Sequence, residues 1–176
     1  MFLISGKGTL KQAALGLGND WGDGNREKVL AAYPDLLNWL QTCPLEYHIG
    51  KLRFVHAGYA LQLLDPVKLT NRYDKLWLRG GYFYSSDHTF AHNPLTETIV
   101  TGHTATGLVG GFYAHDIHPP KYTNSDRSRV YRIAYPGEQP RYLIDGGIDP
   151  HYPNRCGNVA VFDSEAGLLI DVLEDE

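Results

Sequence analysis

The stretch that decides the fold is EYHIGKLRFV, residues 46–55. Residues 46–49 and 52–55 are short runs rich in aromatic and aliphatic side chains, and Gly50-Lys51 between them suits a tight turn. The pattern therefore predicts two β-strands joined as a hairpin.

The patterns on either side of this stretch are of two kinds. Toward the C-terminus, further strands are predicted over residues 99–101, 142–144, 159–162 and 168–172, and residues 163–167 resemble a turn. Toward the N-terminus, apolar residues at helical spacing predict helices over residues 9–17, after a cap at Asn25, and from Pro34-Asp35 to Cys43-Pro44. Helices followed by a strand-rich half predict an α/β fold.

Length and composition predict one globular domain spanning residues 1–176. Of the 176 residues, 43% are hydrophobic and 20% are charged, which argues against disorder and against a fibrous repeat. The net charge of −4 offers no broad basic face for nucleic acid. No apolar run approaches the roughly 18 residues of a membrane span, so we expect a cytoplasmic protein without membrane contact. Residues 105–140 are weakly patterned and predict a long loop insertion.

Two histidines share one sequence context. His56 follows the strand predicted over residues 52–55, and His103 follows the strand predicted over residues 99–101, each beside small residues. Strand ends of α/β folds converge on a common site, and imidazole suits Mn, Fe or Zn. A single histidine here would more often be a loop residue satisfied by hydrogen bonds. The repetition of the context favours a pair of metal ligands.

Several short motifs, in order along the chain, carry a family resemblance. They are FVHAG at residues 54–58, LWLR at 76–79, VTGHT at 100–104, LIDGG at 143–147 and GNVAV at 157–161, and the helix from Asp35 to Leu40 with Pro44 precedes them. The set resembles the phosphoprotein phosphatase branch of the calcineurin-like metallophosphoesterases. The resemblance covers roughly residues 30–172.

The resemblance implies a fold and a mechanism. The fold would be a two-sheet β-sandwich flanked by helices, in α-β-β-α layers. In the family, two divalent ions about 3.5–4 Å apart hold the hydroxide that attacks phosphorus. Residues that match His56 and His103 ligate one of these ions, which we expect to be Mn, with Fe or Zn as alternatives.

Three further residues are assigned by their position in the motifs. Arg79 is the candidate catalytic residue that neutralises the phosphoryl oxygens, and its alternative is a surface arginine beside Trp77. Asp145 would either orient a metal-binding imidazole or cap the turn before Gly146. His151 would line the substrate site near the strand that carries the LIDGG motif.

The chain departs from the family at its N-terminal side. The DxH, GDxxDRG and GNH[DE] motifs, which supply most metal ligands in the family, are absent from residues 1–55. We therefore expect the C-terminal part of a catalytic domain that lacks the first strands, with sheet edges that favour self-association.

The expected substrates are phosphoserine or phosphothreonine in a protein, or a small phosphoester. The alternatives are a diadenosine polyphosphate hydrolase and a catalytically inactive binding or regulatory chain.

Overall fold

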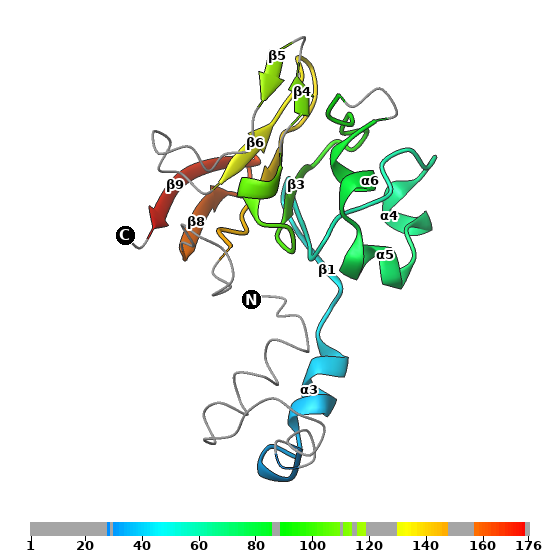
Figure 1. Ribbon diagram of the computed structural model, residues 1–176, viewed down its shortest axis with the longest axis vertical. Coiled ribbons are helices and arrows are strands. Elements are labelled where there is room, and N and C mark those ends of the chain that lie inside the picture. The colour runs from blue at the N-terminus through cyan, green and yellow to red at the C-terminus, as the bar shows by residue number, and fades with distance from the viewer. Residues whose placement is uncertain are drawn as a thin grey trace. The chain divides into compact units, whose positions relative to one another are not determined.

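The computed structural model in Figure 1 describes residues 28, 30–85, 89–109, 111–113, 116–118, 130–147 and 157–174. Backbone contacts divide the chain into two units, residues 1–44 and 45–176. In the first unit, residues 30–32 are helical and α3 spans Leu36–Thr42. The helix predicted to end at Cys43-Pro44 is thereby confirmed. The predicted helix over residues 9–17 and the cap at Asn25 lie outside the described residues.

The predicted hairpin forms with the expected bounds. Strand β1 (Glu46–Ile49) pairs antiparallel with β2 (Leu52–Val55), with Ile49 opposite Leu52. Gly50 has a φ of 56°, and a Cβ there would lie 2.2 Å from the carbonyl oxygen of Ser164. The turn therefore requires glycine for its backbone angle and for its close approach to the backbone of Ser164.

The hairpin belongs to a five-stranded mixed sheet in the order β1-β2-β3-β7-β6. Strands β3 (Thr98–Thr101) and β7 (Arg141–Leu143) continue parallel to β2, while β6 (Tyr131–Ile133) closes the sheet antiparallel to β7. The strands predicted at residues 99–101 and 142–144 are confirmed to within a residue. The parallel centre places the ends of β2, β3 and β7 along one edge.

Short helices cover one face of the sheet. They are α4 (Pro66–Leu69), α5 (Arg72–Trp77) and α6 (Gly80–Phe83). The side chains of Asp65 and Asn71 cap α4 and α5 by accepting backbone N–H bonds. The buried core on this face joins strand residues to aromatic residues of the covering segment. Its members include Val55, Ile99, Leu143, Tyr59, Tyr82, Phe83 and Phe90.

The hairpin β8 (Asn158–Asp163) and β9 (Leu168–Glu174) packs on the opposite face of the sheet. Leu52, Val100 and Tyr142 are buried there, in a cluster completed by side chains of both hairpin strands. The strands predicted over 159–162 and 168–172 are confirmed; β8 extends beyond both predicted ends, and β9 extends beyond its predicted C-terminal end. The result is a mixed α/β fold with a five-stranded sheet, a packed hairpin and short helices.

The segment 105–140 contains more structure than predicted. It holds a 3-10 turn (η1, Thr106–Leu108), the antiparallel pair β4 (Gly111–Tyr113) and β5 (Asp116–His118), and the sheet strand β6. These elements were not predicted, because three-residue strands are too short to show alternation and β6 is fixed by its pairing with β7. Within the described residues, no helix is long and apolar enough to span a membrane.

Candidate metal centre

The carboxyl ends of β2 and β3 bring the two predicted histidines together. Val55 lies opposite Thr101 in the parallel register, and His56 and His103 follow just beyond this pair. The backbone N–H of Gly102 donates a 3.0 Å hydrogen bond to the carbonyl oxygen of His56, which extends the ladder past the strand ends. The sheet itself therefore sets the separation of the two histidine-bearing loops.

The two imidazoles face each other through ring nitrogens. Nε2 of His56 lies 3.1 Å from Nδ1 of His103, and the ring planes are inclined by 58°. Two nitrogens on one ion, each about 2.0–2.1 Å from it, are about 3.0–3.4 Å apart when the angle at the ion is about 95–110°. The observed separation fits ligation of a single ion by both nitrogens.

The backbone of His103 is unusual. Its φ is 68°, and among the described residues it is the only non-glycine residue with a positive φ. Such a conformation costs about 1–3 kcal/mol and persists where surrounding contacts impose it, most often at functional sites. The strain therefore indicates that the placement of this imidazole is constrained by its neighbours.

The surroundings of His103 keep its ring neutral. Burial lowers the pKa of His103 to about 4, with further contributions from the charges of Arg79 and His56. A neutral imidazole keeps one nitrogen lone pair for a metal at neutral pH. Its other nitrogen, Nε2, is buried and has no hydrogen-bond partner within the part of the chain that the structure describes.

Arg79 lies beside the imidazole pair. Its Nη1 donates hydrogen bonds to the carbonyl oxygen of His103 at 3.4 Å and to Oγ1 of Thr104 at 3.1 Å. The side chain is otherwise exposed. Trp77, two residues earlier, packs nearly perpendicular to the His103 ring with 5.6 Å between ring centroids. Arg79 was predicted as a site residue from the sequence, whereas Trp77 and Thr104 were assigned no role.

The other two predicted residues differ in their placement. Asp145 follows β7, and its Oδ1 accepts a 2.9 Å hydrogen bond from the backbone N–H of Gly147. The carboxylate thus caps a turn, as in the alternative interpretation, and makes no hydrogen bond to either imidazole in the described structure. His151 lies outside the described residues.

The described residues supply fewer ligands than a complete metal site needs. Among the described residues, no group of three or more His, Cys, Asp or Glu side chains is arranged to hold a metal ion. Metal sites in proteins generally use at least three protein ligands. His56 and His103 therefore supply two ligands toward a site that needs others.

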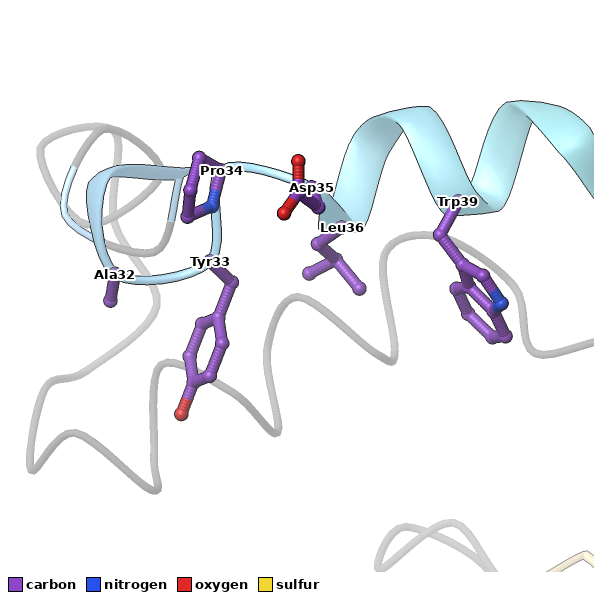
Figure 2. A pocket seen from close by; sticks show the side chains of 6 residues that line it. All are labelled: Ala32, Tyr33, Pro34, Asp35, Leu36 and Trp39. Atoms are coloured by element: carbon purple, nitrogen blue, oxygen red, sulfur yellow. The ribbon is translucent and has the colours of Figure 1, made fainter.

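A separate hollow lies in the first unit, along the start of α3 and the residues before it (Figure 2). It has a volume of about 510 Å³ and is lined by Ala32, Tyr33, Pro34, Asp35, Leu36 and Trp39. Among its described lining residues, the ionisable side chains are those of Tyr33 and Asp35, which do not make a set of metal ligands.

Comparison of the chain with protein families, with curated proteins and with solved structures gives no match. The geometry around His56 and His103 is therefore the feature that points to a function.

Proposed function

We propose that the chain is a metal-dependent phosphoesterase that hydrolyses phosphate monoesters such as phosphoserine and phosphothreonine. The observation that supports this proposal is the 3.1 Å approach of His56 Nε2 to His103 Nδ1 at the ends of two adjacent parallel strands. The position of Arg79 adds a fixed positive charge beside this pair.

We infer a metallophosphoesterase-type sandwich, in which the five-stranded sheet is one layer and β8–β9 belongs to the second. The support is the second apolar cluster, where Phe54 and Tyr142 of the sheet pack against Phe162 of the hairpin. Helices α4–α6 cover the opposite face, as an outer helical layer would.

The chain's own residues would perform two tasks at the site. His56 and His103 would hold a divalent ion, Mn with Fe or Zn as alternatives, through the facing nitrogens. When bound, such an ion supplies Lewis-acid polarisation of a phosphoryl oxygen and lowers the pKa of water. Arg79 would attract the phosphoryl oxygens, because its remaining guanidinium N–H groups make no hydrogen bond within the described residues.

The direct test is hydrolysis of p-nitrophenyl phosphate with added Mn²⁺. We expect activity in the unmodified chain and a loss of at least about 100-fold in His103→Ala, since a ligand is removed. His48→Ala is the matched control, because His48 is an exposed histidine on β1, and it should retain activity. Equal activity in His103→Ala and the unmodified chain would defeat the proposal.

A second candidate is a metal-binding or regulatory chain without catalysis. It is favoured by the ligand count, because two imidazoles alone hold an ion weakly and position it poorly. Titration with Mn²⁺ or Zn²⁺ separates the two candidates. Binding that depends on His103 without any phosphoester hydrolysis would favour the second.

A further inference from the structure

Residues 75–79, which are the end of α5 and the two residues that join it to α6, contact both histidine-bearing loops; we call this segment the clasp. On the His56 side, the carbonyl oxygen of Lys75 accepts a 2.9 Å hydrogen bond from the backbone N–H of Ala57. On the His103 side, Arg79 donates to His103 and Thr104, and Trp77 packs against the imidazole. One short segment therefore touches the chain directly after each imidazole.

The first residue of the clasp is firmly anchored. Lys75 is buried, and its Nζ lies 3.2 Å from Oε1 of Glu46 in β1 and donates to the carbonyl oxygen of Val67. The same carboxylate of Glu46 accepts a hydrogen bond from the buried Tyr59. The clasp is thus fixed to the edge of the sheet, so its contacts are made from a rigid support.

The loop that the clasp holds is the strained one. His103 has a positive φ, and its buried Nε2 has no hydrogen-bond partner in the described structure, so neither its backbone preference nor its second nitrogen fixes the ring. The hydrogen bonds from Arg79 reach the residue's own carbonyl oxygen and the next side chain. These contacts are therefore well placed to impose the conformation.

We propose that Arg79 is a positioning residue, whose guanidinium holds the 102–104 turn so that Nδ1 of His103 stays directed at Nε2 of His56. This role is separate from attraction of a phosphoryl group, and it operates before any substrate arrives. Its consequence for metal affinity rests on the proposed function, whereas its consequence for the position of the ring does not.

The position of the ring is tested on the full chain without metal. NMR should show a nuclear Overhauser effect between the ring protons of Trp77 and His103 in the unmodified chain. We expect Arg79→Gln to lose it and Arg79→Lys, which keeps a cationic donor, to retain part of it. Arg72→Gln is the matched control, since Arg72 is an exposed arginine on α5, and it should leave the signal unchanged.

Thermal unfolding distinguishes positioning from general stability. Arg79 is exposed, so Arg79→Gln should unfold at nearly the same temperature as Arg72→Gln. If Arg79→Gln keeps the Trp77–His103 signal of the unmodified chain, the positioning role is overturned. The positioning role is also overturned if Arg79→Gln loses the signal because the whole chain unfolds, while Arg79→Lys stays folded. The loss would then reflect global stability and not a local effect.

The effect of Arg79 on metal affinity is measured by calorimetric titration of each variant with Zn²⁺ alone. We expect Arg79→Gln to bind about 10–100-fold more weakly than the unmodified chain, with Arg79→Lys between them. Equal affinities would overturn the proposed consequence for the metal. An unmodified chain that binds no Zn²⁺ or Mn²⁺ would instead defeat the proposed function, while the NMR result would still decide whether Arg79 positions His103.

Discussion

Nη1 of Arg141 donates a 2.6 Å hydrogen bond to the carbonyl oxygen of Tyr82, and its guanidinium carbon lies 4.9 Å from the centroid of the Tyr82 ring. Nη2 of the same guanidinium donates to the carbonyl oxygens of Phe83 and Ala91. Arg141 is 1% exposed, so a strand residue of β7 satisfies three backbone groups of the covering segment from inside the core. The link fixes the end of α6 to the sheet.

Removal of this guanidinium should destabilise the fold severely. Arg141→Met would leave the carbonyl oxygens of Tyr82 and Ala91 without their donor, whereas that of Phe83 keeps the N–H of Ala91, and each unsatisfied buried group costs about 1–3 kcal/mol. We expect the free energy of unfolding, measured by urea denaturation, to fall by at least about 2 kcal/mol. Arg132 on the neighbouring strand β6 is exposed, so Arg132→Met should change the free energy of unfolding by less than about 0.5 kcal/mol. Similar losses in the two variants would contradict this assignment.

Gly58, two residues after His56, should not tolerate a side chain. Its φ is 145°, and a Cβ there would lie 2.5 Å from Cγ of Tyr82, whose ring is fully buried. Gly58→Ala must therefore adopt a strained backbone and displace a core ring, and we expect a loss of at least about 2 kcal/mol by thermal or urea unfolding.

The control for Gly58 is Gly80→Ala at the start of α6. A Cβ at Gly80 meets no atom within 4 Å, and alanine favours the helix. Gly80→Ala should leave stability unchanged or raise it by up to about 1 kcal/mol. Equal destabilisation by the two substitutions would show that the contact with Tyr82 is not the cause.

The sequence predicted the strands whose limits are set locally. Gly50-Lys51 marked the turn between β1 and β2, and Asp163 to Gly167 marked the turn between β8 and β9. It did not predict β6, because Tyr131–Ile133 is defined by pairing with β7 rather than by its own pattern. Its single-domain prediction over residues 1–176 stays a prediction.

At the candidate site, residue type and strand position were enough to select His56 and His103. The positive φ of His103 and its bonds from Arg79 were not predictable, because they depend on how the clasp packs over a loop distant in sequence. For Asp145, both of its roles fitted the sequence, and the hydrogen bond that it accepts from Gly147 supports the turn-capping role. Local patterns thus located the imidazoles, whereas tertiary packing determines how they are held.

Acid should weaken the fold through Glu97. Burial would raise the pKa of Glu97, but the hydrogen bond and charge of Arg53, 2.9 Å away, outweigh it and hold the pKa below its usual 4.5. The unfolded chain therefore takes up a proton at a higher pH than the folded chain does. The contribution to stability is present above about pH 4.5 and is lost as the pH falls through the lower folded value.

The measurement for Glu97 is urea denaturation at a series of acidic pH values. Glu97→Gln cannot titrate, so its stability should fall less steeply below pH 4.5 than that of the unmodified chain. Glu165→Gln, at an exposed position in the turn between β8 and β9, is the control and should preserve the slope. An unchanged slope in Glu97→Gln would assign the acid sensitivity to other groups.

The β8–β9 hairpin should promote self-association. Val159, Val161, Ile170 and Leu173 are 42–66% exposed on its two strands, and the structure describes no third strand in that sheet. Exposed apolar residues on an unpaired hairpin favour association between copies.

Sedimentation velocity should therefore show a mass that rises with protein concentration, and the double substitution Val161→Lys with Ile170→Lys should suppress the rise. Leu64→Lys, at an isolated residue that is 99% exposed, should not. A chain that remains monomeric at every concentration, with a sharp thermal transition independent of concentration, would refute this role of the hairpin.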